Sequence, residues 1–324
     1  MFGDWMRTVT AMLGRWLGGD RTAGGSHRAG SAAVEDVAPG PGPQWGTLSG
    51  LTAHPTDPHR LYAVTDQDSP PLRIIEIDVS QSPARAVGQT LVVAPGFDGL
   101  DFEGIVAKPE GGFWLASEGG VGNTPPNMLL EVDANGRLLR SIGLPQNLAS
   151  KVQKKGFEGV AREETAGGTR LHVVFQGPLD GDPEDMARIG TLDLASGVWR
   201  FSYYPLERLL NGDNTGLSEI VSLGGSRFAV IERDGKGGRK AVKWVATFSL
   251  ADDGAPPGSP PRWLKKTIAL DLVPLFTREG RKVAKEIEGL AVAADGQVYA
   301  ITDNDGDGAT LLLRLGSAEA LFGP

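Results

Sequence analysis

The chain has 324 residues and a formal net charge of −8, with 46 glycines, 22 prolines and no cysteine. The lack of cysteine excludes disulfides, thiolate metal sites and a cysteine nucleophile, and an acidic chain without a basic stripe argues against a nucleic-acid partner. The composition favours a turn-rich β protein whose acids suit cations, or substrates that arrive with a cation.

The first 44 residues read as two segments that precede the main domain. Residues 2–17 carry apolar side chains at helical spacing, which predicts an amphipathic helix over residues 1–19. Its Trp-rich face suits peripheral contact with a membrane, and docking on the domain is the alternative. The segment lacks the continuous apolar core and cleavage site of a secretory signal. Residues 20–44 are expected to form a Gly/Pro-rich flexible linker, with the main domain over residues 45–324.

The main domain contains five related stretches. DFEGIVAKPEGGFWLASEGG (101–120) has an apolar residue, an acid, a glycine and a short apolar run, followed by a turn and a second β-rich run that ends in an acid. Stretches over 47–68, 156–177, 216–235 and 286–305 share this frame. The equivalent positions are Gly50, Gly104, Gly159, Glu219 and Gly289. Five copies indicate a repeat architecture in which each unit packs on its neighbours.

Each repeat is long enough for four antiparallel strands. The second unit predicts strands near 103–107, 113–117, 128–132 and 137–142, and the third near 157–162, 170–176, 188–194 and 197–204. Four strands repeated radially form a β-propeller blade, so we expect an all-β propeller of five blades. A sixth, diverged blade in the long interval between the fourth and fifth repeats stays open.

The last repeat is too short to supply four strands from its own residues. Its outer strand is either the tail SAEALF (317–322) or a strand borrowed from the segment before Trp45. Borrowing is favoured because it closes the ring without an open edge.

The topology of a propeller predicts that the acids gather. The inner strand of a blade starts at the mouth of the channel where the second strand ends. The first-strand positions are Ser49, Glu103, Glu158, Ser218 and Glu288, and the second-strand positions are Asp66, Glu118, Gln176, Glu232 and Asp303. Two carboxylates 5 Å apart repel by about 3 kcal/mol at an effective dielectric near 20. The acids must therefore take up protons, interleave with cations or bind a hard cation.

Two kinds of positive charge could neutralise the acids: cationic side chains and a bound metal ion. Lys154, Lys155 and Arg233 each lie near a repeat acid and are the expected interleaving cations. Oxygen-only ligands favour Ca²⁺, with Mg²⁺ second, over zinc.

The loop DNDGDG in the last repeat resembles the first half of a calcium loop. It places Asp303, Asp305 and Asp307 at alternating positions before Gly308. Arg314 occupies loop position twelve, where an EF-hand needs a bidentate glutamate, so an EF-hand is excluded. A calcium site in a propeller loop and a solvated acidic turn remain the two interpretations.

Structural explanations exist for the same residues. A carboxylate at a strand end can accept hydrogen bonds from backbone N–H groups of the next blade. Glycine after the acid allows close approach of inner strands or forms a bulge. Other catalytic apparatus is poor, because GLSEI (216–220) departs from G-x-S-x-G and His172 falls inside a strand. No phosphate-cradling glycine loop is present, so no organic cofactor is expected.

The ordered set of motifs resembles a known family. The matching stretches are LSGL…LYAVTD (48–66), DFEGI (101–105), GFEGV (156–160), VIERD (230–234), EIEGL (286–290) and ITDND (301–305). Over about residues 45–315 the chain resembles the bacterial phytase-like, or "esterase-like activity of phytase", family. The resemblance implies a propeller that hydrolyses phosphate or carboxylic esters. It also implies export, whereas the chain shows no signal peptide, so a cytoplasmic or membrane-surface location stays open.

The sequence thus yields one leading hypothesis, a calcium-dependent ester hydrolase that acts on a small anionic or ester substrate as a monomer. The expected metal ligands are Asp66, Glu103, Glu118, Glu232, Glu288, Asp303, Asp305 and Asp307. The expected catalytic residues are Glu103, Glu158, Glu288 and Arg233, and the expected substrate-binding residues are Lys154, Lys155 and Arg233. The alternatives are a non-enzymatic propeller that holds a structural cation, and a lactonase-type calcium hydrolase.

Overall fold

A computed structural model of the chain describes residues 32–39, 46–66, 71–119, 126–152, 156–250, 258–304 and 309–324. The predicted helix over residues 1–19 lies outside the described residues. The same holds for Lys154, Lys155, Asp305 and Asp307, which the sequence proposed as substrate-binding and metal-binding residues.

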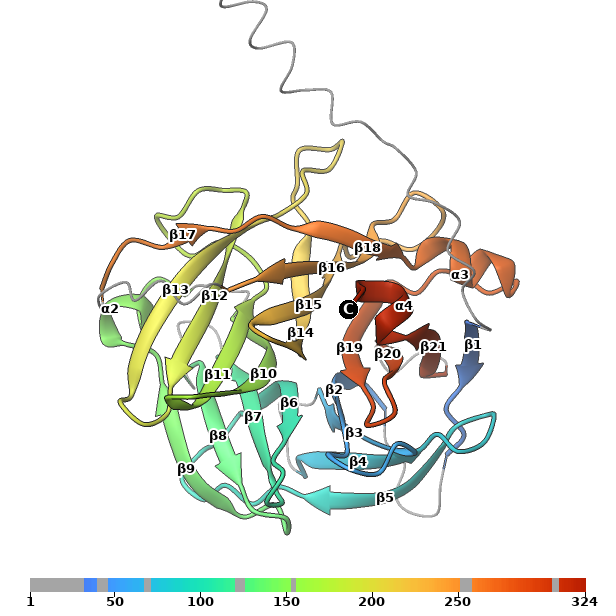
Figure 1. Cartoon of the computed structure of the whole chain (residues 1–324), viewed down its shortest axis with the longest axis horizontal. Helices are drawn as coiled ribbons and strands as arrows, with labels where there is room; N and C mark the ends of the chain where they lie inside the picture. Colours follow the sequence, from blue (N-terminus) through green and yellow to red (C-terminus); the bar gives the residue numbers. More distant parts are fainter. Residues whose placement is uncertain are drawn as a thin grey trace, which may run out of the picture.

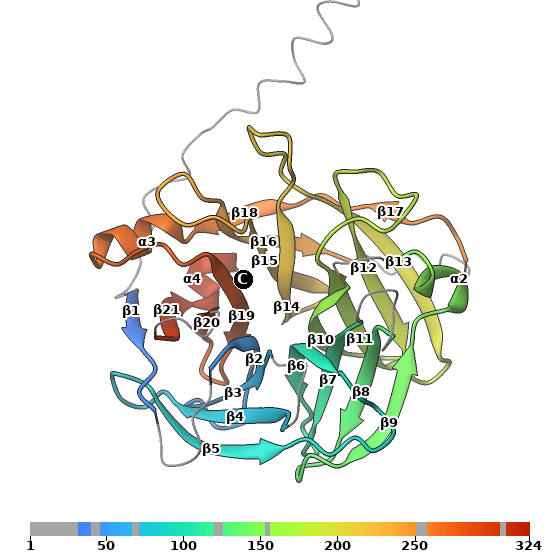
Figure 2. The same cartoon turned by 180° about the vertical axis from the view of Figure 1, so that it is seen from behind.

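Five antiparallel sheets stand around a central axis, as Figures 1 and 2 show from its two ends. Blade 1 contains β2 (Leu48–Ala53), β3 (Arg60–Thr65), β4 (Arg73–Asp78) and β5 (Arg85–Leu91). Blade 2 contains β6 (Asp101–Ala107), β7 (Phe113–Glu118), β8 (Met128–Val132) and β9 (Leu138–Gly143). Blade 3 contains β10 (Phe157–Thr165), β11 (Gly168–Phe175), β12 (Met186–Asp193) and β13 (Val198–Pro205). The predicted five-blade propeller is confirmed, and the strands predicted for the second and third repeats match within a few residues.

The last two blades contain the remaining long strands. Blade 4 contains β14 (Gly216–Gly224), β15 (Arg227–Arg233), β16 (Lys243–Ser249) and β18 (Thr267–Asp271). Blade 5 contains β19 (Glu286–Val292), β20 (Gln297–Asp303), β21 (Leu311–Ser317) and β1 (Ala33–Asp36). In every blade the first strand of the repeat (β2, β6, β10, β14 or β19) is innermost.

Strand β1 closes the ring as the borrowed outer strand of blade 5. It pairs antiparallel with β21, from Ala33 opposite Arg314 to Asp36 opposite Leu311. The favoured closure is therefore confirmed, and it corrects the predicted boundary, because a strand lies within the expected linker of residues 20–44. The tail SAEALF is mostly the short helix α4 (Ala318–Phe322) instead of a strand.

The long interval between the fourth and fifth repeats does not form a sixth blade in the part of the chain that the structure describes. It contains β18, the helix α3 (Val273–Arg278) and β17 (Arg262–Trp263). Strand β17 pairs in parallel with β13, so blade 3 becomes a five-stranded sheet. A further short helix, α2 (Gln146–Ala149), follows blade 2.

The apolar core is divided among the interfaces between neighbouring blades. Between blades 1 and 2, for example, Val64 and Ile74 pack with Phe102, Ile105 and Leu115. Alternate residues of a strand point to opposite faces, and both faces of an inner blade are covered, so both sets are apolar. The pocket that all five inner strands line along the axis is largely apolar as well.

Within the described residues, none of the helices has the length and apolar character needed to traverse a bilayer.

Candidate functional site

The inner strands approach each other so closely that only glycine fits at the contact. A Cβ atom at Gly104 would lie 2.4 Å from the carbonyl oxygen of Glu158 in the next blade, and one at Gly50 would lie 2.6 Å from the carbonyl oxygen of Glu103. A carbon atom cannot approach a carbonyl oxygen so closely without a backbone shift. The glycines of four of the five repeats therefore set the narrow diameter of the ring, and the residue before each glycine lies at the rim.

Each inner strand also has an irregular register at the residue before the glycine position. The pairing of β6 with β7 shifts between Phe102 and Gly104, so Glu103 is the extra residue. Corresponding shifts occur between Leu48 and Leu51, Phe157 and Val160, Leu217 and Glu219, and Ile287 and Gly289. A bulge redirects the side chain of its extra residue. Both structural explanations for the Glu-Gly pair thus apply, and together they bring the acids to one mouth.

Three carboxylates from two blades form the most crowded part of the mouth. One oxygen each of Asp66, Asp101 and Glu103 lie within 4.8 Å of one another, and all three residues are partly buried. The hydroxyl of Ser49 donates a hydrogen bond of 2.7 Å to Glu103 Oε2. Burial, together with the charges of Asp66, Asp101 and Glu288, raises the pKa of Glu103 well above its ordinary value. The crowding expected from topology is present, and it disfavours a fully ionised cluster.

Glu158 extends this cluster into blade 3. Its side chain is buried, with 2% exposure. Burial raises the pKa of Glu158 well above its ordinary value, and the charges of Glu103, Glu118 and Glu288 raise it further. The positive charge of Arg233 acts in the opposite direction. Glu158 therefore keeps a proton to a higher pH than an exposed glutamate.

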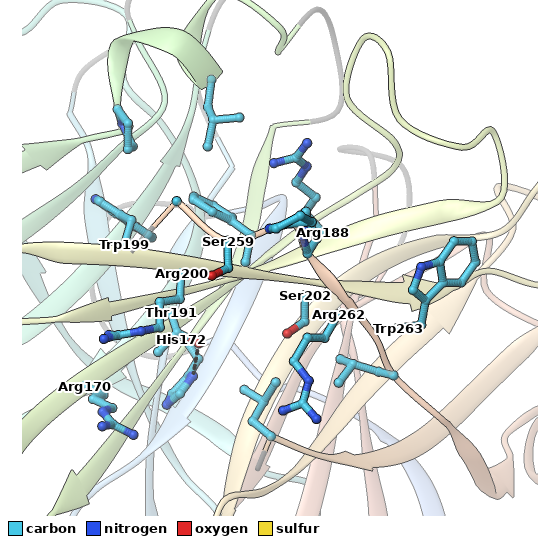
Figure 3. A pocket seen from close by; sticks show the side chains of 18 of the residues that line it. Arg170, His172, Arg188, Thr191, Trp199, Arg200, Ser202, Ser259, Arg262 and Trp263 are labelled. Carbon is cyan, nitrogen blue, oxygen red and sulfur yellow. Dashed lines mark hydrogen bonds between the residues drawn. The ribbon is translucent and has the colours of Figure 1, made fainter. Parts of the chain in front are cut away.

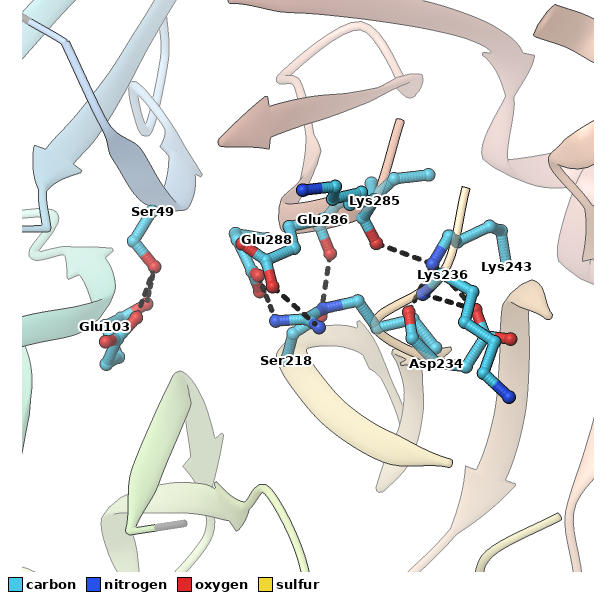
Figure 4. Close-up of polar contacts among 11 residues, drawn as sticks. Ser49, Glu103, Ser218, Asp234, Lys236, Lys243, Lys285, Glu286 and Glu288 are labelled. Atoms are coloured by element: carbon cyan, nitrogen blue, oxygen red, sulfur yellow. Dashed lines mark hydrogen bonds and ion pairs between the residues drawn. The ribbon is translucent and has the colours of Figure 1, made fainter. Parts of the chain in front are cut away.

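Arg233 supplies positive charge on the blade 4 side of the mouth. Its guanidinium forms an ion pair with Glu288 and lies 3.6 Å from Glu286. Figure 4 shows Glu286 and Glu288 together with the Ser49–Glu103 pair. Burial lowers the pKa of Arg233, but Glu288, Glu158 and Glu286 outweigh this effect and raise it. Arg233 is thus permanently charged and faces the acids.

A buried lysine behind Arg233 joins blade 4 to blade 5. The Nζ atom of Lys243 donates to Asp234 Oδ1 at 2.9 Å and to the carbonyl oxygen of Lys285 at 2.6 Å, and its side chain is fully buried (Figure 4). Burial lowers the pKa of Lys243, and Asp234 opposes that shift. Because Asp234 follows Arg233 and Lys285 precedes Glu286, this bond holds both halves of the Arg233 cluster.

The donor set at the mouth fits a hard cation. Asp66, Asp101 and Glu103 offer only oxygen atoms at mutual distances that one ion can span, as Ca²⁺ and Mg²⁺ require. In addition, Glu288 Oε2 is buried and has no hydrogen-bond partner among the described residues. A buried carboxylate oxygen without a hydrogen-bond donor costs folding free energy. A cation bound at the mouth, in addition to Arg233, would reduce that cost.

Two other predicted ligands lie at the ends of their second strands. Glu118 Oε1 accepts a hydrogen bond of 2.5 Å from the backbone N–H of Gly156 in the next blade. Asp303 is buried and lies opposite Glu286 in the register of β20 with β19. Glu118 thus makes the backbone contact named as the structural alternative, while its charge still reaches Glu158.

Glu232 departs from its predicted position at the mouth. Its carboxylate lies between blades 3 and 4, where it accepts hydrogen bonds from Tyr204, from Thr215 and, at 2.7 Å, from Lys266. Neighbouring residues of a strand point to opposite faces, so Arg233 takes the side of the acidic cluster and Glu232 takes the other side. The expectation that Glu232 is a metal ligand at the mouth is therefore corrected.

Two carboxylates near the axis, Asp101 and Glu219, were not predicted as site residues from the sequence. Asp101 lies two residues before Glu103 at the start of β6, where its acidic side chain could have been noted. Glu219 occupies the position of glycine in blade 4 and is fully buried. It accepts hydrogen bonds of 2.9 Å from the backbone N–H groups of Leu51 and Ile220. Burial raises the pKa of Glu219 well above its ordinary value. Its carboxylate thus links blades 1 and 4 across the axis.

Several solved structures are similar to this chain. A protein of unknown function from Dyadobacter fermentans has 9% identity and a TM-score of 0.48, with 90% of this chain and 84% of that chain covered. An α-L-arabinanase from Cellvibrio cellulosa has 11% identity and a TM-score of 0.45, with 83% and 91% covered. A β-fructofuranosidase from Bombyx mori has 12% identity and a TM-score of 0.47, with 94% and 66% covered.

Comparison with curated proteins gives no match. The family model described as phytase-like, esterase-like activity of phytase, matches residues 43–306, which include all five inner strands and every carboxylate of the mouth described above. The resemblance inferred from the motifs is thereby confirmed, and the chain belongs to the phytase-like family.

Proposed function

We propose that the chain is a hydrolase of ester bonds, with phosphate monoesters as the first candidate substrates and carboxylic esters as the second. Its active site is the acidic mouth, and its working form holds Ca²⁺ there. The observation that carries this proposal is the convergence of Asp66, Asp101 and Glu103 within 4.8 Å, beside a buried Glu158 and a permanently charged Arg233. Membership of the phytase-like family supports ester hydrolysis over a purely structural role.

Asp66, Asp101 and Glu103 are the residues that would hold the cation. Ser49 orients Glu103 through its 2.7 Å hydrogen bond, and it leaves the second carboxylate oxygen available as a ligand. When bound, a divalent cation polarises the ester oxygen and lowers the pKa of a coordinated water. Neutralising the cluster also lowers the raised pKa of the ligand Glu103, so cation binding would release a proton. Burial, the largest cause of the raised pKa of Glu158, remains.

Glu158 is the candidate for proton transfer. Its raised pKa lets it hold a proton at pH values where an exposed glutamate is ionised. In that form it donates the proton to the leaving oxygen as the ester bond breaks. The carboxylate that remains takes a proton from the attacking water, which restores the starting state.

Arg233 is the candidate for binding the anionic part of the substrate. Glu288 and Glu286 hold its guanidinium in place, and Lys243 fixes the two strands that carry these residues. A fixed guanidinium needs little reorganisation when negative charge develops on the substrate. A phosphate monoester suits this mouth because its oxygens can accept hydrogen bonds from Arg233, and a bound cation would offset the rest of its negative charge.

The test combines calcium binding with turnover. We expect Ca²⁺ to raise the melting temperature of the EDTA-treated protein and to switch on hydrolysis of p-nitrophenyl phosphate, or else of p-nitrophenyl acetate. Glu103→Gln should abolish the calcium-dependent rise. Glu158→Gln should retain most of that rise and lose about 100-fold or more in kcat, the usual contribution of a general acid or base.

Glu232→Gln is the matched control, because this buried carboxylate precedes Arg233 in β15 but lies outside the acidic cluster. We expect it to lower the melting temperature while the calcium-dependent rise and the turnover per folded molecule remain. Stabilisation by Ca²⁺ without turnover of either ester would contradict the proposal and favour a binding module. Turnover that persists unchanged in EDTA would exclude the cation.

A further inference from the structure

A second cavity lies at the outer part of blade 3, and it shares no residue with the acidic mouth. Its volume is about 550 Å³, within the range of about 300–1,000 Å³ that is typical of small-molecule sites. We call it the basic cavity because five cations are in its lining: Arg170, Arg188, Arg200, Arg262 and Lys265. Asp182 offsets the charge of Arg188, and Arg170, Arg200 and Arg262 have partners of their own. What the cavity can do chemically therefore depends on the other polar side chains of its lining.

Three of these polar side chains come from three neighbouring strands of blade 3. His172 in β11 lies opposite Ala161 in β10 and opposite Thr191 in β12. Residues opposite each other, and residues two apart on one strand, share a face of the sheet. Glu163, two residues after Ala161, is therefore on the same face as His172 and Thr191. The strand position of His172, which argued against a catalytic role, thus gives it two polar neighbours.

The imidazole of His172 connects a carboxylate to a hydroxyl. Its Nε2 atom lies 3.1 Å from Glu163 Oε2, and its Nδ1 atom lies 3.0 Å from Thr191 Oγ1. Figure 3 shows His172 and Thr191 next to each other in the lining. The hydroxyl of Ser226, from blade 4, donates to Glu163 Oε1 at 2.8 Å. An ionised carboxylate only accepts hydrogen bonds, so Nε2 carries the proton and Nδ1 accepts the hydrogen bond from Thr191.

The charge states of this network suit proton transfer. The hydrogen bonds from His172 and Ser226 lower the pKa of Glu163, which is therefore ionised at neutral pH. Burial lowers the pKa of His172, Glu163 opposes this shift and Arg170 adds to it. His172 is therefore neutral at pH 7 and can accept a proton from the hydroxyl at its Nδ1 atom.

The two ends of the network differ in their access to the cavity. Glu163 and His172 are 8% and 1% exposed, and the ring of His172 packs on Phe228 of blade 4, with ring centroids 4.5 Å apart. Thr191 is only partly buried and lies in the wall of the cavity. The base is thus held rigidly, while the hydroxyl that it contacts can be reached by a small molecule.

The lining on the blade 4 side supplies apolar surface. Leu250, which follows β16, and Leu264, which follows β17, both line the cavity and pack against the apolar core between blades 3 and 4. The backbone N–H of Leu264 donates to the carbonyl oxygen of Tyr203 at 2.8 Å, so the segment after β17 is held on blade 3. This part of the cavity therefore suits a small apolar group rather than a second charge.

We propose that Thr191, His172 and Glu163 form a second active site, which hydrolyses small carboxylic esters with an apolar acyl group and needs no metal ion. A hydroxyl is activated when a base lies within about 2.6–3.2 Å and a third group orients that base. Thr191 is the nucleophile and His172 is the general base, while Glu163 is a positioning residue that acts through His172.

The reaction proceeds in two steps. The Oγ1 atom of Thr191 forms a bond to the carbonyl carbon of the ester, and its proton passes to Nδ1 of His172. The bond from that carbon to the alcohol oxygen then breaks, the alcohol leaves with the proton, and the acyl group stays on Thr191. Water next attacks the acyl carbon and gives a proton to His172, which returns it to Thr191 as the acid leaves. Glu163 stays ionised and stabilises the imidazolium in both steps.

Labelling with phenylmethanesulfonyl fluoride tests the nucleophile. This reagent forms a sulfonyl ester with an activated hydroxyl and releases fluoride. The full chain is treated in EDTA, so that the acidic mouth holds no cation, and mass spectrometry of its peptides locates the label. We expect the label on Thr191, and Thr191→Val, which keeps the shape of the side chain, should lose it.

Thr169→Val is the matched control. Thr169 is a partly buried threonine of β11 whose hydroxyl donates to Glu164 at 2.8 Å, and it does not line the cavity. This variant should be labelled on Thr191 as the wild type is. Absence of label on Thr191 in both proteins would overturn the proposal.

Turnover of p-nitrophenyl butyrate in EDTA tests the reaction. It is measured in Glu158→Gln, so that the mouth lacks its proposed proton donor. Adding Thr191→Val should lower kcat about 100-fold or more, whereas Thr191→Ser should retain turnover because its hydroxyl still contacts His172. Glu163→Gln should lower kcat and move the low-pH limb of the rate profile to lower pH, since the carboxylate raises the pKa of His172. A purely structural role of Glu163 would leave that limb in place.

Equal turnover in Thr191→Val and Thr169→Val would overturn the proposal, and melting temperatures verify that both variants fold. Any ester turnover that remains in Thr191→Val belongs to the mouth, so the calcium dependence of the mouth is measured in that variant as well. The two proposals therefore fail separately.

Discussion

Like charges cluster in two regions: the acidic mouth, and the basic cavity at blade 3 that Arg170, Arg188, Arg200, Arg262 and Lys265 line. The two regions accommodate these charges in different ways. At the mouth the acids face each other, and burial raises the pKa values of Glu103 and Glu158. In the basic cavity carboxylates stand behind the cations, and Asp182 pairs with Arg188 through two hydrogen bonds. The mouth therefore retains repulsion that protons or a cation relieve, whereas at the basic cavity Asp182 already offsets the charge of Arg188.

The two regions also differ in origin. The mouth is built mainly from equivalent positions of the repeat, each set by a bulge and, in four of the five blades, by a glycine contact. The basic cavity depends on β17, which belongs to no repeat position. A change at the ring should therefore disturb the whole propeller, and a change at the cavity should disturb only local binding.

The largest expected effect on stability is at Lys243, behind the mouth. Lys243→Met leaves the buried Asp234 carboxylate without its cation, and removing one member of a buried pair costs about 3–5 kcal/mol. Urea unfolding of this variant should show that loss. Lys236→Met, at an exposed lysine nearby, should unfold like the wild type. A loss below about 1 kcal/mol would show that the Lys243 bond does not hold the two blades.

A smaller effect is expected where the inner strands touch. Gly104→Ala places a methyl group 2.4 Å from the carbonyl oxygen of Glu158, and overpacking costs about 1–3 kcal/mol. The variant should also weaken the calcium-dependent rise in melting temperature, because the ring positions the acids. Gly143→Ala has open space for its methyl group and serves as the control. Equal free energies of unfolding for both variants would mean that the inner strands move apart to accommodate the methyl group without loss of stability.

The pH dependence of stability separates the mouth from the basic cavity. The folded-state pKa values of Glu103, Glu158 and Glu219 lie above their unfolded values. Their contribution to stability is therefore full below about pH 4.3 and is lost as the pH rises through the folded pKa values. In EDTA the free energy of unfolding should fall by up to about 1.4 kcal/mol per pH unit for each such proton.

Denaturant melts between about pH 5 and pH 9 measure this slope. Glu158→Gln should flatten it, because one titrating group is removed, and saturating Ca²⁺ should flatten it as well. Arg262→Ala should leave it unchanged. A slope that is the same in the wild type and in Glu158→Gln would show that the mouth does not store the repulsion described above.

The smallest effect on stability is expected at the basic cavity. Arg262 is exposed, so Arg262→Ala should change the free energy of unfolding by less than about 0.5 kcal/mol. The melting temperature of this variant should match that of Arg239→Ala. A large loss of stability would indicate that Arg262 holds β17 on blade 3.

Much of the fold could be predicted from the sequence because the repeat carries it. The acid or serine followed, in four repeats, by glycine, together with the turn signals between strands, marks the inner hairpin of every blade. The short last repeat favours a borrowed closing strand. Glu103, Glu158 and Glu288 were predicted at one mouth because equivalent residues of a radial repeat must meet. Glu232 was misplaced because strand alternation, together with the Tyr204 and Lys266 partners, sends its side chain between blades.

By itself the sequence determined the repeat and its inner hairpins, because periodic apolar runs and tight turns are local signals repeated along the chain. It favoured five blades, closure by a borrowed strand and the family resemblance. Only the tertiary structure decided which acids face each other, that Glu219 takes a glycine position on the axis, and that β17 crosses to blade 3. These outcomes depend on bulges, on side-chain direction and on pairing between segments about 60 residues apart. No local pattern records such contacts, since they form only when distant blades pack together.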